Sequence, residues 1–241
     1  MKFIITLFLF TFSLIASAND CTSMVFRGKF PVAKEPVVIL CHQRYVVGYS
    51  ISRKAPLWTA EKLTANQLKS NKSFRLNAFR YNPQLPVNQQ PQIGDFVGNE
   101  YDRGHMVNFE DLADDAWAAS EGFYMTNMIA QHYQNNRGIW KALENRARYL
   151  AETRQEVYIV TGAIFEDTRR LSAGTSIPTK LFKMILAPST KEAFTVVIPN
   201  APFESSTLPS FMVTINDLQK MNRHVNVFPT RYQFLNQKAL K

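Results

Sequence analysis

Short runs of Val, Ile, Leu and aromatic residues recur along the chain, separated by polar or turn-forming residues. Runs of about four to eight such residues between turn signals are typical of β-strands. Turns are predicted at residues 42–44 and 188–190, and residues 57–63 could form a short helix instead of a strand. The predicted strands are residues 37–40, 45–49, 57–63, 123–125, 157–161 (ending at Gly162), 181–186 and 193–198.

One segment has apolar residues at three- and four-residue steps instead. Ile139, Leu143, Ala147 and Leu150 form a stripe that predicts a helix over residues 136–152. Because strands dominate and do not alternate strictly with helices, the chain is predicted to be α+β. Its central sheet should be mainly antiparallel and flanked by helices. The other predicted segments are short helices at 111–120 and 215–218 and a surface loop, rich in proline and amides, at 82–92.

The first residues have the composition of a secretory signal. Lys2 precedes an apolar run over residues 3–15, and Ala16-Ser17-Ala18 follows it. The alternative is a buried N-terminal helix or strand. The signal interpretation predicts a segment 1–18, a single domain at 19–241, and an exported, periplasmic or extracellular protein. No membrane span is expected after it, and either a monomer or a homodimer is compatible with the sequence.

Charge and cysteine content add two expectations. The chain has 28 Lys and Arg against 19 Asp and Glu, a formal net charge of +9, which suits a polyanionic partner. In an oxidising compartment Cys21 and Cys41 are predicted to form a disulfide, contributing about 3 kcal/mol. Neither cysteine has an activating motif, and two cysteines without a CxxC spacing are too few for a metal site.

The candidate chemistry lies in Asp102-Arg103-Gly104-His105, which is followed by Asn136 at the predicted start of the helix. A neutral imidazole at His105 can accept a proton from water. Gly104 is expected to let the backbone turn tightly. Asn136 can offer an amide oxygen to Mg²⁺, although an N-cap is the commoner role for such an asparagine. Asn135 could cap the helix while Asn136 points to the site.

Positions four apart on the helix extend this candidate site. Asn136, Trp140, Glu144 and Arg148 form a row along one face. Asn136 and Glu144 could lie near one cation, with Glu144 acting through a metal-bound water. The simpler alternative is that Glu144 and Arg148 form a surface ion pair and that Trp140 packs in the core.

Three motifs in order resemble those of the DNA/RNA non-specific endonucleases, the group of the Serratia nuclease and endonuclease G. That family has a DRGH tetrapeptide, an Asn-x-x-Pro-Gln segment and an Asn-x-Gly-x-Trp-x-x-Leu-Glu helix. The corresponding segments here are residues 101–106, 126–131 and 136–144.

The resemblance implies a ββα-metal (His-Me finger) core and a Mg²⁺-dependent hydrolase, with Mn²⁺ or another divalent cation also possible, that acts on DNA and RNA. It implies that His105 is the general base and Asn136 the direct metal ligand. Arg103, Asn127, Glu144 and Arg148 would organise the phosphate, the metal waters and the transition state.

Two departures from the family pattern leave other functions open. Ala130 replaces the usual proline, and residues 106–111 replace a small proline-containing stretch and bring in Glu110 and Asp111. A catalytically weak nucleic-acid-binding protein of the same fold is therefore an alternative. A phosphodiesterase for another ester is a further one.

Overall fold

The computed structural model describes residues 21–70, 72–223, 225–226 and 236–237. The predicted signal at residues 1–18 lies outside this part of the chain. Among the described residues, no helix has the length and apolar character needed to cross a membrane.

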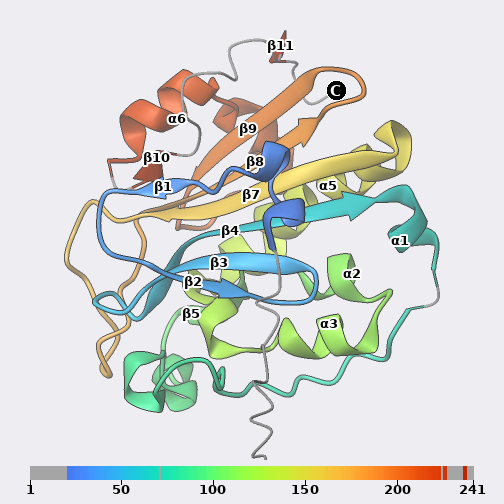
Figure 1. Cartoon of the computed structure of the whole chain (residues 1–241). Helices are drawn as coiled ribbons and strands as arrows, with labels where there is room; N and C mark the ends of the chain where they lie inside the picture. Colours follow the sequence, from blue (N-terminus) through green and yellow to red (C-terminus); the bar gives the residue numbers. More distant parts are fainter. Residues whose placement is uncertain (1–20, 71, 224, 227–235, 238–241) are drawn as a thin grey trace, which may run out of the picture.

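A central sheet organises the molecule and confirms the α+β prediction (Figure 1). Six strands pair antiparallel in the order β9-β8-β7-β4-β3-β2, and β11 adds to β9 in parallel. Residues 57–63 are strand, not helix, because they pair on both sides. The strands are β2 Val38–Cys41, β3 Tyr45–Ser50, β4 Ala55–Thr64, β7 Glu156–Ile164, β8 Lys180–Ala187, β9 Glu192–Pro199 and β11 Asn236–Gln237.

Strand β7 continues past Gly162 to Ile164, so the predicted end at Gly162 is wrong. Gly162 lies opposite Phe182 of β8, and a Cβ at Gly162 would lie 2.1 Å from the Phe182 ring. The glycine is therefore a packing requirement within the sheet and not a chain break.

One long helix lies against the sheet and carries much of the candidate site. Helix α5 (Lys141–Arg154) contacts β4, β7 and β8. Its apolar stripe is buried as predicted, with Leu143, Ala147 and Leu150 each at most 1% exposed. The late helix α6 (Ile215–Met221) also forms where predicted and contacts β9.

Several local predictions in the middle of the chain are wrong. The predicted helix at 111–120 is two helices, α2 (Phe109–Leu112) and α3 (Ala116–Glu121), because Asp115 caps α3 by accepting from the backbone N–H groups of Trp117 and Ala118. Residues 123–125 form no strand and lead into the 3₁₀ turn η5 (Met125–Asn127).

The segment at 82–92 is only partly a surface loop. Asn82 and Gln90 are buried, and two hydrogen bonds join them: the Asn82 backbone N–H donates to Gln90 Oε1, and Gln90 Nε2 donates to the Asn82 carbonyl. This pairing satisfies the buried amides and holds the loop against the body.

The predicted disulfide is present and joins Cys21 to Cys41, so it ties η1 to β2. The remaining short elements are η1 Cys21–Met24, η2 Phe26–Gly28, β1 Val32–Ala33, α1 Ala65–Lys69, η3 Val87–Gln89, η4 Ile93–Phe96, η7 Ser205–Phe211 and β10 Val225–Asn226.

Candidate active site

The DRGH residues lie in a two-stranded hairpin that the hydrophobic pattern did not predict. Strand β5 (Tyr101–His105) pairs antiparallel with β6 (Met128–His132), and His105 lies opposite Met128. Strand alternation assigns Arg103 and His105 to one face of the hairpin and Asp102 and Gly104 to the other. The chain then continues from β6 directly into the helix that carries Asn136.

Gly104 does not form the tight turn expected from the sequence, since it sits inside β5. A Cβ there would lie 2.3 Å from Gln131 Oε1 and 2.6 Å from Gln131 Cβ. Gln131 is buried and donates to Asn135 Oδ1 at 2.8 Å. The glycine therefore makes room for a side chain that links the hairpin to the helix.

His105 is held between aromatic rings and guanidinium groups. Its ring centroid is 5.2 Å from Phe123 and 5.7 Å from Phe79, and its Nε2 is buried without a hydrogen-bond partner in the described structure. Burial, with smaller contributions from Arg75 and Arg103, lowers the pKa of His105 to about 3. The imidazole is therefore neutral at pH 7, and the same shift makes it a weaker base than a free imidazole.

Two arginines accompany this imidazole. Arg103 donates to the Ile93 carbonyl at 3.0 Å, and its guanidinium lies 4.4 Å from the Phe79 ring centroid. Arg75 was not found from the sequence, because it lies in a loop without a motif. Its place in the sequence between two apolar residues, Phe74 and Leu76, was the available signal.

The helix begins three residues earlier than predicted and contains a π-helical turn. It runs as α4 (Tyr133–Asn135), the π turn η6 (Asn136–Trp140) and then α5, and Gly138 has non-helical dihedrals (φ −106°, ψ −105°). The His132 side chain caps it by accepting from the Gln134 backbone N–H. Turns of this kind often occur at functional sites.

Neither asparagine caps the helix. Asn135 is buried and donates to the carbonyls of Pro199 and Ala201. Asn136 Nδ2 donates to Asp102 Oδ2 at 2.9 Å, and Arg137 makes a two-pronged contact with the same carboxylate. Although burial opposes ionisation, the hydrogen bonds from Arg137 and Asn136 lower the pKa of Asp102. An ionised Asp102 thus fixes the amide and leaves Asn136 Oδ1 available.

Glu144 lies about two turns after Asn136, is buried, and does not form the surface ion pair with Arg148 that was the alternative interpretation. Burial raises its pKa to about 7, against the lowering effects of Lys183 and of a hydrogen bond with Asn108. Arg148 donates instead to Asp111 Oδ1 at 2.9 Å. Both members of this pair are largely removed from water, so loss of either one would leave an uncompensated buried charge.

Asn127 is fully buried, and its amide is used within the protein. Its Oδ1 accepts from the Val107 backbone N–H, and its Nδ2 donates to the carbonyls of Val107 and Gly122. The geometry offers no free group for the substrate contact expected of Asn127. The side chain instead fixes the backbone two residues after His105.

The candidate site therefore consists of side chains from the hairpin, the helix and the neighbouring loops, and not of a single group of metal-ligating residues. No hydrogen bond joins His105 to Asn136 in the described chain; Asp102 links Asn136 to the strand that carries His105. Within the same residues, no group of three or more His, Cys, Asp or Glu could hold a metal ion.

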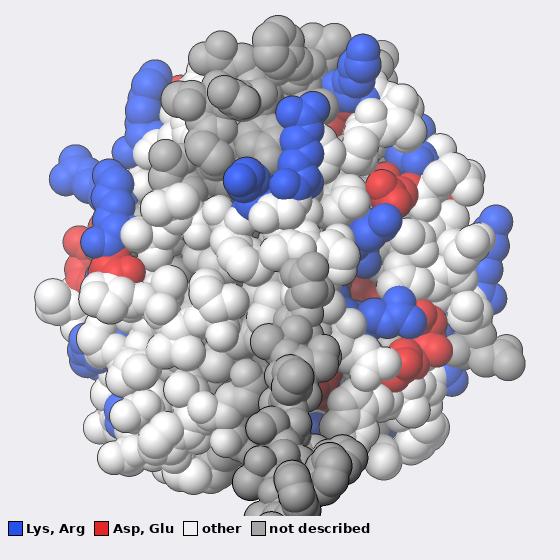
Figure 2. Space-filling view, viewed as in Figure 1, with Lys and Arg blue, Asp and Glu red and all other residues white. Residues whose placement is uncertain are grey.

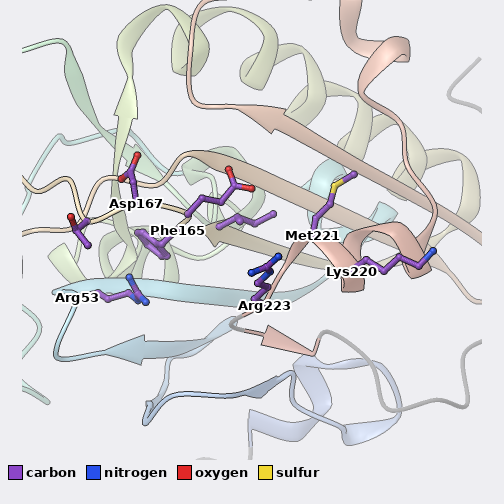
Figure 3. Close-up of a pocket in the computed structure, with 9 residues that line it drawn as sticks. Arg53, Phe165, Asp167, Lys220, Met221 and Arg223 are labelled. Carbon is purple, nitrogen blue, oxygen red and sulfur yellow. The ribbon is translucent and has the colours of Figure 1, made fainter.

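Two surface features lie apart from this site. A cavity of about 640 Å³ is lined by Arg53, Phe165 and Arg223 among others, and none of the predicted site residues lines it (Figure 3). Figure 2 shows Lys and Arg scattered over the visible face, with acidic groups between them at the sides. The basic excess does not form one continuous patch on that face, so it does not mark a binding surface there.

Comparison with known proteins identifies the family. A model of the DNA/RNA non-specific endonucleases matches residues 22–234. The chain belongs to this family. The resemblance seen in the three motifs is therefore confirmed.

Individual relatives agree with this assignment. Mitochondrial nuclease EXOG of Danio rerio is 28% identical over 211 residues, covering 80% of this chain and 62% of the relative. Nuclease C1 of Cunninghamella echinulata is 29% identical over 196 residues, covering 74% and 78%. A structure from a complex of EndoG with EndoGI covers 86% of this chain and 94% of its own, with a TM-score of 0.74 and 23% identity, which supports the fold.

The relatives also correct one prediction. The exported, periplasmic or extracellular location is wrong by this comparison, because the EXOG, endonuclease G and Nuclease 1 relatives are all named mitochondrial. The chain spans 62% of the length of the Danio rerio nuclease EXOG and 54% of the Mus musculus one.

Proposed function

We propose that this family member is a divalent-metal-dependent endonuclease that hydrolyses phosphodiester bonds in DNA and RNA, with His105 as general base. The state of His105 carries the proposal. Its pKa of about 3 leaves the imidazole neutral, its Nε2 has no partner in the described structure, and Arg75 and Arg103 stand beside it. A neutral imidazole takes a proton from an attacking water, and fixed guanidinium groups attract a phosphate.

The residues present fit a hydrated divalent cation. Asn136 Oδ1 is available because Asp102 engages only the amide nitrogen, and the buried Glu144 carboxyl can accept from a metal-bound water. When bound, the cation neutralises charge on the phosphate and stabilises the leaving oxygen. Mg²⁺ is the proposed ion because it prefers oxygen ligands and retains several waters. Mn²⁺ or another divalent cation could use the same donors.

Protein groups supply the positioning. Asp102 orients the Asn136 amide through its 2.9 Å hydrogen bond. Arg148 is held by Asp111 and by Asn145 Oδ1 at 2.6 Å, and in this proposal its fixed guanidinium stabilises the charge that grows during reaction. Arg103 is anchored at the Ile93 carbonyl and contributes positive potential beside His105.

The alternative of a catalytically weak binding protein rests on the acidic residues after His105. Asp111 is 3% exposed and pairs with Arg148, so its charge is compensated inside the protein. That acid therefore has little effect on an approaching phosphate.

We further propose that residues 19–241 form one domain. Analytical ultracentrifugation of the purified chain would distinguish a monomer from a homodimer.

The test is cleavage of supercoiled plasmid and of RNA by the purified chain with MgCl₂, with EDTA as the metal-free arm. We expect both polymers to be degraded, with open circles appearing before linear plasmid, and His105→Ala to lose at least about a thousandfold in rate. His132→Asn, which keeps a capping acceptor, is the control histidine variant and should retain activity. Equal cleavage by His105→Ala and the unsubstituted chain would refute the assignment of the base.

A further inference from the structure

An apolar groove of about 340 Å³ lies beside the candidate active site. The segment at residues 73–78 forms one wall and helix α3 the other, with Phe109 and Phe123 among the residues between them. No charged side chain lines the groove. Its lining residues are Ser73, Phe74, Leu76, Ala78, Phe109, Ala116, Ala119, Ser120 and Phe123. The groove thus suits a flat, neutral group.

The groove is next to His105 through one shared neighbour, Phe123. Phe123 lines the groove, and its ring also meets the His105 ring edge-on at 5.2 Å. The Arg75 guanidinium lies 5.3 Å from the Phe109 ring centroid and 5.6 Å from that of Phe123. A phosphate held at His105 and Arg75 would therefore have its attached nucleoside at the mouth of the groove.

The rim carries unusually exposed apolar side chains. Phe74 is 86% exposed and Leu76 is 65% exposed, and they flank Arg75 in the sequence. Exposed apolar groups gathered around one groove indicate a binding surface. Arg75 could contact the anionic phosphate of a nucleotide, while Phe74 and Leu76 could contact the apolar face of its base.

We propose that this groove receives an unpaired nucleobase next to the scissile phosphate, so that single-stranded nucleic acid is cleaved in preference to duplex. The inference rests on the proposed nuclease function. A base can enter only after leaving its stack and its pair, which a single strand permits at little cost and a duplex resists. Aromatic stacking tolerates every base, which agrees with a family that is non-specific.

The experiment compares three oligomers of equal length: single-stranded dT20, a duplex of the same length, and a 20-unit phosphate backbone with no bases. We expect the unsubstituted chain to cleave dT20 with a kcat/KM about tenfold above the other two. The double variant Phe74→Ala with Leu76→Ala should lose about tenfold on dT20 and at most about twofold on the base-free oligomer. Tyr149→Ala, which removes an exposed aromatic from α5, is the control and should keep the preference.

Failure of the groove proposal and failure of the nuclease proposal give different results. An equal loss on all three oligomers in the double variant, or no loss on dT20, overturns the role of the groove while cleavage persists. If no polymer is cleaved, the fluorescence anisotropy of labelled dT20 and base-free oligomer in EDTA still tests the groove. Tighter binding of dT20 that the double variant abolishes supports it, and equal binding refutes it. Circular dichroism verifies that the variants are folded.

Discussion

Replacing Glu144 with Gln should stabilise the metal-free protein at alkaline pH, contrary to the usual effect of a change at a buried site. Burial raises the pKa of Glu144 from its ordinary 4.5 to about 7, so the folded chain disfavours the ionised carboxylate. The folded state binds this proton more tightly than the unfolded state. Stability from this group is therefore greatest below about pH 4.5 and falls as the pH rises toward 7.

The size of the effect follows from the separation of the two pKa values. At about 1.4 kcal/mol per pH unit, the ionised carboxylate costs about 3 kcal/mol at pH 8 and about 1 kcal/mol at pH 5. A glutamine side chain at this position cannot ionise and has nearly the same volume as glutamate. Glu144→Gln should therefore unfold at higher urea concentration than the unsubstituted chain at pH 8 in EDTA, with a smaller difference at pH 5.

Tryptophan fluorescence during urea unfolding measures the free energy of unfolding of the unsubstituted chain and of Glu144→Gln at each pH. Glu152→Gln is the matched control, because Glu152 lies on the same helix but is exposed, and it should show no comparable pH-dependent gain. Saturating MgCl₂ at pH 8 should then stabilise the unsubstituted chain more than Glu144→Gln. A Glu144→Gln protein that is less stable at pH 8, or equally shifted at both pH values, would refute the account of a buried carboxyl.

Three further substitutions test other parts of the structure. Gly104→Ala forces a Cβ against Gln131 and should cost about 1–3 kcal/mol in the free energy of unfolding, read from urea midpoints. Cys41→Ser removes the disulfide and should lower stability by about 3 kcal/mol under non-reducing conditions, with no further loss on adding dithiothreitol. Asp102→Ala frees the Asn136 amide and should lower kcat about tenfold and raise the Mg²⁺ concentration for half-maximal rate.

The sequence predicted the elements whose apolar side chains are buried in the core. The stripe from Ile139 to Leu150 and the strands of the central sheet are regular because each has a buried face against the core. Strand β5 was missed because Asp102, Arg103 and His105 are polar on both faces of the hairpin. A hydrophobic pattern does not predict a strand whose side chains are polar and not buried in the core.

Long-range partners could not be predicted for the same reason. Helix spacing offered Glu144, four residues away, as an alternative ion-pair partner for Arg148, but Arg148 pairs with Asp111, which is distant in sequence. Arg75 reaches His105 from a loop with no regular structure. The motif could name His105 and Asn136, whereas their electrostatic surroundings depend on how three separate segments pack.

Burial acts in opposite senses on the two titratable groups of the proposed mechanism. It lowers the pKa of His105 and raises that of Glu144, so both groups favour their neutral forms. The low pKa leaves the imidazole neutral but also makes it a weak base, and an anionic phosphate beside it would raise its affinity for a proton. A neutral carboxyl must first lose its proton before it can support a hydrated cation, and a divalent charge nearby provides the compensation that burial removed. Burial thus opposes both working states, and the charges of the bound phosphate and cation would favour a protonated His105 during reaction and an ionised Glu144.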